Sequence, residues 1–134
     1  MSPVTRKPPP DALADEPAVV LDQVTHGFVR LDDAVIALAD AGRMTSLAGL
    51  VARRLDLSAD AVERALDAAS PEPASLVCRA AGLGANGFSA VLRLRRRRMR
   101  DTGPSPAQAL SGFVQTPVVL AQRVVRMMKA NEGR

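Results

Sequence analysis

Aromatic residues are nearly absent from this chain of 134 residues. It has no tryptophan and no tyrosine, and its aromatic side chains are those of Phe28, Phe88 and Phe113. Strands favour β-branched and aromatic residues, whereas short aliphatic side chains pack well between closely spaced helices. Because 47% of the residues are apolar, Leu, Val and Ala must fill the core. The composition therefore predicts a helical fold.

Cysteine and histidine each occur only once, as Cys78 and His26. A single cysteine excludes an intramolecular disulfide, which fits a reducing compartment. A lone histidine cannot build a metal site without further ligands, and this one has no nucleophile beside it in the sequence. We therefore predict no metal and no other cofactor, and we expect Cys78 to be a buried structural residue.

Long apolar runs are also lacking. No stretch approaches the roughly 18 apolar residues that a membrane span needs. The charged residues near the N-terminus, Arg6 and Lys7, are not followed by the apolar segment of a signal peptide. The sequence predicts a cytoplasmic protein without a membrane span.

Charge is unevenly distributed, although the net charge is only +4. Residues 10–72 carry twelve acidic and five basic side chains, a charge of −7. Residues 73–134 carry eleven basic and two acidic side chains, a charge of +9. A basic half of this kind attracts an acidic protein surface, a phosphate backbone or an anionic membrane.

Three segments follow from the pattern of residues. Residues 1–17 contain five prolines and little to bury, so we interpret them as a flexible arm. Residues 18–130 show helical periodicity and form the folded domain, and residues 131–134 form a tail. In the first helix, Val20, Val24, Gly27, Phe28 and Leu31 are expected on one inward face. Asp32 is expected to cap the second helix, which ends near Gly42.

The clearest signal is a pair of matching helical units. The first has helices at residues 46–55 and 59–69 with Ser58 as N-cap, and the second has helices at 74–81 and from Ala85. At an offset of 26 residues, Ala48, Leu50, Val51, Arg53, Leu57, Ala59 and Leu66 recur as Ala74, Leu76, Val77, Arg79, Leu83, Ala85 and Leu92.

A further helix is expected to open at Thr116-Pro117, with Val118, Leu120, Ala121, Val124, Val125 and Met128 as its apolar content. Repeated pairs predict an all-α fold of stacked helical hairpins, a short HEAT-like alpha-solenoid. Its open ends would favour homo-oligomers.

The same residues carry a family resemblance. Residues 50–67 and 71–94, with Cys78-Arg79-Ala80-Ala81-Gly82-Leu83 and Phe88 as the most specific piece, resemble the C-terminal part of an alphaproteobacterial family, domain-of-unknown-function family 2336. Residues 109–127 are similar to that family's last helix, so the resemblance covers about residues 30–128. It implies an alpha-solenoid fold. It implies no activity and no catalytic residue.

Six arginines lie within eight residues at the end of the second unit: Arg93, Arg95, Arg96, Arg97, Arg98 and Arg100. On a helix they would spread over every face, so some must be exposed. Such density gives a salt-dependent attraction to phosphates. The plainer interpretation is a solvated helix end, whose cations favour the negative pole of the helix dipole.

No set of residues here has the spacing of an enzyme active site. The leading hypothesis is a non-enzymatic interaction module, an adaptor or regulator, that binds an acidic protein partner through the arginine cluster. The alternative is a helix-turn-helix-like nucleic-acid-binding regulator that uses the same arginines, since residues 74–92 have the proportions of that motif. Only Asn86 and Ser89 at the start of its second helix could read base edges. The pattern Gly82-x-Gly84-x-x-Gly87 matches a dinucleotide fingerprint, but no strand precedes it.

Overall fold

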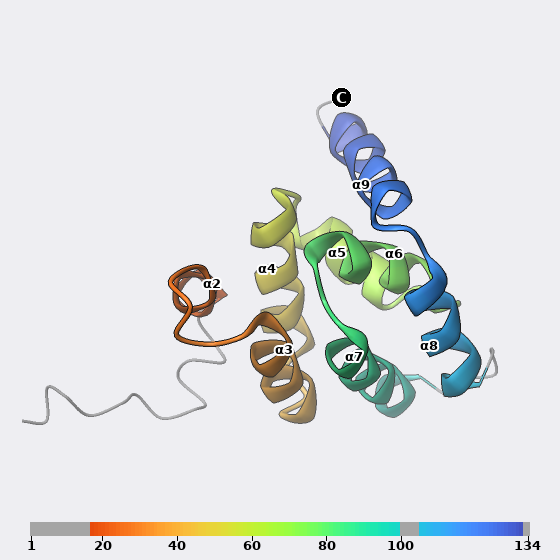
Figure 1. Ribbon diagram of the computed structural model, residues 1–134, viewed down its shortest axis with the longest axis horizontal. Helices are drawn as coiled ribbons and strands as arrows, with labels where there is room; N and C mark the ends of the chain where they lie inside the picture. The colour runs from red at the N-terminus through yellow and green to blue at the C-terminus, as the bar shows by residue number, and fades with distance from the viewer. Residues whose placement is uncertain (1–16, 100–104, 133–134) are drawn as a thin grey trace, which may run out of the picture.

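The computed structural model describes residues 17–99 and 105–132, which form an all-helical fold, as predicted (Figure 1). Over these residues the helices are α2 (Pro17–Thr25), α3 (Leu31–Asp40), α4 (Met44–Leu55), α5 (Ala59–Leu66), α6 (Glu72–Ala81), α7 (Ala85–Arg98), α8 (Pro106–Gln115) and α9 (Val118–Glu132). Helix α9 thus continues two residues beyond the predicted end of the domain. The predicted arm, apart from Pro17, lies outside the described residues. No helix in the described ranges is long and apolar enough to cross a membrane.

The two predicted units share one turn geometry. Asp56 ends α4 and Gly82 ends α6, both in the left-handed region, with φ values of 57° and 93°. The next N–H donates to a carbonyl five residues earlier, from Leu57 to Ala52 (2.9 Å) and from Leu83 to Cys78 (3.1 Å). This is the hydrogen bond of a Schellman motif. The turns are 26 residues apart, so the end of the first helix and the start of the second recur at the predicted offset in the two units.

Packing, in contrast, often joins helices that are distant in the sequence. Helix α4 packs on its neighbour α5 and on α2, whereas α7 packs mainly on α3 and α9 mainly on α6. In Figure 1, α2 lies at one end of the molecule, and α8 and α9 lie at the other. Stacked hairpins are compatible with the α4–α5 pair, but the connections between α3 and α7 and between α6 and α9 also hold the fold together.

Aliphatic side chains and two rings fill the core. Helices α4, α5 and α7 contribute buried apolar side chains from one face each, with Leu55 half-buried at the end of α4. The buried side chains include Leu47, Leu50, Val51, Val62, Ala65, Leu66, Phe88, Val91 and Leu92. Phe88 of α7 stacks on Phe113 of α8, with ring centroids 4.3 Å apart and planes 7° apart. The guanidinium carbon of Arg79 lies 5.4 Å from the centroid of Phe113, within the range of a cation–π contact.

Two predictions for the N-terminal helices are wrong. Helix α2 ends at Thr25, so Phe28 falls in the following turn, where it is 80% exposed and stacks on His26. Asp32 does not cap α3, because the helix starts at Leu31 with Arg30 as its N-cap, two residues earlier than predicted. Asp32 lies in the first turn of α3, and its carboxylate contacts a different helix.

Candidate interaction surfaces

The predicted arginine site lies at the end of α7, and two of its side chains cap other helices. Arg95 is only 1% exposed, and its Nη1 donates to the carbonyl of Leu66, the last residue of α5, at 2.6 Å. Arg97 donates through Nη2 to the carbonyl of Ala39, near the end of α3. The last carbonyls of a helix have no partner within the helix and carry partial negative charge. These arginines therefore stabilise the fold.

The other described members of the cluster are exposed. Arg93 forms an ion pair with Asp40 at 3.3 Å. Arg98 donates from two nitrogens to the two carboxylate oxygens of Asp67, at 3.0 Å each, and this bonding raises the pKa of Arg98. Arg96 is exposed and forms no hydrogen bond or ion pair with any described residue. Arg100 lies outside the described residues, so Arg96 is the described member of the cluster that is exposed and has no partner among the described residues.

Arginine capping recurs outside the cluster. Arg54 of α4 donates through Nε to the carbonyl of Ala81, the last residue of α6, at 2.9 Å. Arg79 of α6 donates through Nε to the carbonyl of Thr116, which follows α8, at 2.9 Å. The C-terminal ends of α3, α5, α6 and α8 are thus each contacted by an arginine from another helix. Much of the arginine content of this chain serves the fold.

A carboxylate caps the start of α7 in the complementary way. Asp32 accepts hydrogen bonds from the N–H groups of Gly84 (2.8 Å) and Gly87 (2.9 Å). A Cβ atom at Gly84 would lie 3.0 Å from Oδ2 of Asp32, and one at Gly87 would lie 3.0 Å from its Cγ. The glycine pattern therefore does hold an anion on a helix N-terminus, as in nucleotide sites, but the anion is a carboxylate of the same chain.

Helices α3 and α7 are parallel, and charged side chains connect them at both ends. Asp32 connects their N-terminal ends, while Arg93 and Arg97 reach Asp40 and Ala39 at the C-terminal end of α3. Parallel helices bring like poles of their dipoles together, which is unfavourable. The carboxylate lies at the paired positive poles and the guanidinium groups lie at the paired negative poles, so both repulsions are reduced.

The same contact bears on the helix-turn-helix interpretation. The would-be recognition helix α7 has Asp32 of α3 against its first turn. Of the two residues able to read bases, Asn86 is exposed and Ser89 is half-buried. A carboxylate at this end would repel the phosphates that a recognition helix must approach. This end of α7 is therefore poorly suited to DNA.

Cys78 and His26, the single cysteine and the single histidine, lie in different environments. Cys78 is fully buried, as predicted, and burial, with a smaller contribution from the charge of Asp32, raises its pKa to about 12. Its thiolate is therefore scarce at neutral pH. His26 is exposed and forms a hydrogen bond through Nδ1 with the carbonyl of Asp22 at 2.8 Å. Within the described ranges, no group of three potential metal ligands comes together.

Large exposed apolar side chains gather at the α8–α9 end of the fold. Val114, Val119 and Met127 are 52%, 63% and 60% exposed, and Val118 and Leu120 are exposed beside them. The other large exposed apolar residues of the described chain are Val19 and Phe28, at the opposite end. We call Val114, Val118, Val119, Leu120 and Met127, together with Arg123 and Arg126, the α8–α9 surface.

The two arginines of this surface differ from those of α7. Arg123 and Arg126 are exposed and form no hydrogen bond or ion pair with any described residue. Helix α9 buries only Ala121 and Val125 fully. The helix is anchored by an ion pair from Lys129 to Asp56 and by Glu132, which accepts from the N–H of Ser58. Its outer face is therefore left with apolar side chains and unpaired cations.

The sequence predicts the apolar content of the last helix but not which of its apolar residues are exposed. Val118 and Leu120 belong to this content, and both are exposed. Met128, also predicted as apolar content, is half-buried, whereas its neighbour Met127 is exposed. The available signal was that apolar residues occur on more than one face of this helix, which exceeds what a single packed face requires.

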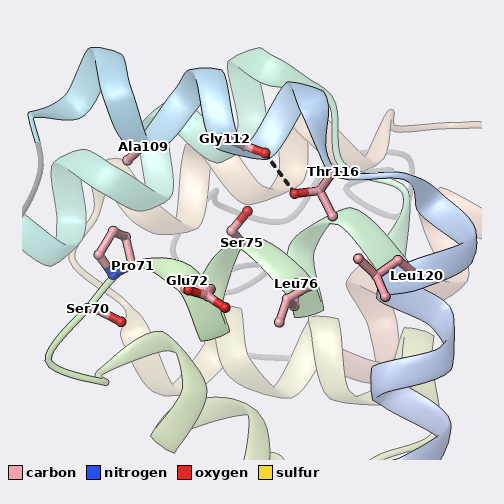
Figure 2. Close-up of a pocket in the computed structure, with 9 residues that line it drawn as sticks. All are labelled: Ser70, Pro71, Glu72, Ser75, Leu76, Ala109, Gly112, Thr116 and Leu120. Carbon is pink, nitrogen blue, oxygen red and sulfur yellow. Dashed lines mark hydrogen bonds between the residues drawn. The ribbon is translucent and has the colours of Figure 1, made fainter.

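A pocket of about 380 Å³ lies next to this surface, between α6, α8 and the start of α9 (Figure 2). Its lining consists of Ser70, Pro71, Glu72, Ser75, Leu76, Ala109, Gly112, Thr116 and Leu120. Leu120 belongs both to the pocket and to the α8–α9 surface, so the two are continuous. Sequence reasoning missed this pocket, because it depends on the placement of α8 against α6.

No family model, curated protein or solved structure matches this chain. The resemblance to domain-of-unknown-function family 2336 therefore stays a prediction.

Proposed function

We propose that this chain is a non-enzymatic interaction module, an adaptor or regulator, that binds an acidic protein partner through the α8–α9 surface. The observation that carries the proposal is the combination of five exposed apolar side chains with Arg123 and Arg126, which have no partner among the described residues. Contiguous exposed apolar patches mark interaction sites. Arginine is enriched in such interfaces, and cations around them attract acidic surfaces.

The proposal keeps the acidic partner expected from the sequence but moves its main contact from α7 to α9. Arg95 and Arg97 contact helix ends within the fold, and Arg93 and Arg98 contact Asp40 and Asp67. Arg96 remains able to add attraction at long range. The single buried cysteine fits a reducing compartment, and we infer a cytoplasmic location.

The test is capture of interacting proteins from a native lysate by the tagged chain and two variants. The first variant carries Arg123→Ser and Arg126→Ser on α9, and the matched control carries Arg96→Ser on α7. All three substituted side chains are exposed, so circular dichroism should show unchanged helicity. Capture of an acidic protein should fall about tenfold in the α9 variant, which corresponds to about 1.4 kcal/mol, and should change less than twofold in the control. Equal capture by all three proteins would contradict the proposal.

Nucleic-acid binding is the second candidate, because Arg96 is exposed on α7 beside Arg93 and the C-terminal half carries a charge of +9. It is tested by titration with a duplex DNA at two salt concentrations. We expect no binding above low salt. Tight binding that falls steeply with salt and is weakened by Arg96→Ser would favour the nucleic-acid function instead.

A further inference from the structure

The pocket beside the α8–α9 surface has largely apolar walls and one buried polar side chain, Ser75, without a partner among the described residues. Figure 2 shows Pro71 and Ala109 towards one end, Leu76 and Leu120 towards the other, and Ser75 between them. Its volume of about 380 Å³ is near the lower end of the range of roughly 300–1,000 Å³ for ligand pockets. The space suits one large side chain rather than an extended molecule.

Ser75 is the group in this pocket that needs a partner. It is only 8% exposed, and its hydroxyl points from α6 towards Gly112 of α8 (Figure 2). The hydroxyl forms no hydrogen bond with any described residue, whereas the nearby Thr116 hydroxyl donates to the carbonyl of Gly112 at 2.7 Å. Covering the Ser75 hydroxyl with a purely apolar group would cost about 1–3 kcal/mol. A suitable occupant therefore carries a polar atom at this depth.

Gly112, in the wall of the pocket, is a second and independent indication that the pocket binds a ligand group. It lies within α8, where glycine costs about 1 kcal/mol relative to alanine. A Cβ atom at this position would meet no atom within 4 Å, so no neighbouring residue requires glycine here. At Gly84 and Gly87, by contrast, Asp32 occupies the space that a Cβ would take. Gly112 instead keeps the wall of the pocket open.

We propose that this pocket receives a tyrosine side chain of the acidic partner, with the Ser75 hydroxyl bonded to the phenol oxygen. This inference rests on the proposed function, because the pocket opens onto the α8–α9 surface through Leu120. A tyrosine ring matches the apolar walls, and its hydroxyl supplies the missing partner. The chain itself has no tyrosine, so a second copy cannot supply this group.

The charged residues around the pocket indicate on which side of the tyrosine the acidic residues of the partner lie. Glu72 lines one side of the pocket and is exposed. Arg123 follows Leu120 by three residues on α9 and lies on a neighbouring part of the same helix face. Met127 continues this stripe seven residues after Leu120. Carboxylates of the partner therefore lie along α9, away from Glu72, with the tyrosine as the anchor.

The inference is tested by a pair of probes that differ by one hydroxyl. N-acetyl-tyrosinamide and N-acetyl-phenylalaninamide are titrated into the isotope-labelled chain, and amide chemical shifts of Ser75, Gly112 and Leu120 are followed. The tyrosine probe should bind about three- to tenfold more tightly to the wild type, the size of one net hydrogen bond. Ser75→Ala should bind the two probes with about equal affinity, since only the hydroxyl is removed.

Gly112→Leu provides the occluding variant, and Gly112→Ala is its matched control. Both side chains enter open space and improve helix propensity, so both proteins should melt at or above the wild-type temperature. The leucine should abolish binding of both probes, whereas the alanine variant should still bind them. Equal affinity of the two probes for the wild type, or undiminished binding to Gly112→Leu, would overturn the inference.

Partner capture separates this inference from the function on which it rests. If Gly112→Leu captures the acidic partner as well as the wild type does, while the Arg123→Ser, Arg126→Ser variant does not, the tyrosine anchor is wrong and the interaction surface stands. If neither variant changes capture, both proposals fail. Loss of capture in both variants supports both.

Discussion

Helices α7 and α9 are both rich in basic residues, but they use them in opposite ways. On α7, Arg95 and Arg97 contact the ends of α5 and α3, and Arg98 is held by Asp67. On α9, Arg123 and Arg126 project from a face that also exposes Val119 and Met127. The denser cluster is thus the more structural one. Local charge density indicates a binding site only where the fold offers the cations no carbonyl or carboxylate of its own.

The largest effect that distinguishes the two helices should come from Arg95. Arg95→Ala removes a buried side chain and leaves the carbonyl of Leu66 without this donor. We expect the free energy of unfolding to fall by about 3 kcal/mol. Arg123→Ala, on the exposed face of α9, should change it by less than about 0.5 kcal/mol. Urea unfolding of the two variants measures the difference, and similar values would refute the assignment of α7 as the structural helix.

A smaller effect is expected at the start of α7. Asp32→Ala removes the acceptor from the N–H groups of Gly84 and Gly87 and should lower the free energy of unfolding by about 2 kcal/mol. Asp33, its exposed neighbour on α3, is the matched control, and Asp33→Ala should have little effect. Equal midpoints for the two variants in thermal unfolding would show that charge in the first turn of α3 matters and the contact with α7 does not.

The smallest effect concerns the anchor of α9. A hydrogen bond from Lys129 lowers the pKa of Asp56 below its ordinary value of 3.8. A carboxyl group with a lowered folded-state pKa stabilises the fold above its unfolded pKa and loses this contribution as the pH falls through the folded value. The wild type should therefore be slightly more stable than Lys129→Ala at pH 7, and the difference should vanish in acid well below pH 3.8. A difference that persists in acid would show that the pair is not the cause.

The sequence was sufficient for features that depend on neighbouring residues. The helical class, the capping by Ser58 and the burial of Cys78 all follow from local pattern and spacing. Phe28 was misplaced because the periodicity continued past Thr25, where the helix ends.

Features that depend on distant residues could not be predicted in this way. The acceptors of Arg95 and Arg97 are carbonyls 29 and 58 residues away, and a sequence pattern does not show which helix ends will be adjacent. The pocket likewise requires the placement of α8 on α6. The outer face of α9 was missed because the apolar residues of this helix were predicted without a division between a packed face and an exposed one.

The parallel contact of α3 with α7 has a consequence for how this molecule is made and how it fails. Proteins built of independent repeats can gain or lose a terminal unit while the remainder keeps its structure. Here Asp32 needs Gly84, and the end of α3 needs Arg97. During synthesis, α3 therefore lacks its main packing partner until more than fifty further residues have been added. A cut between α3 and α7 would separate two helices that supply contacts to each other's ends.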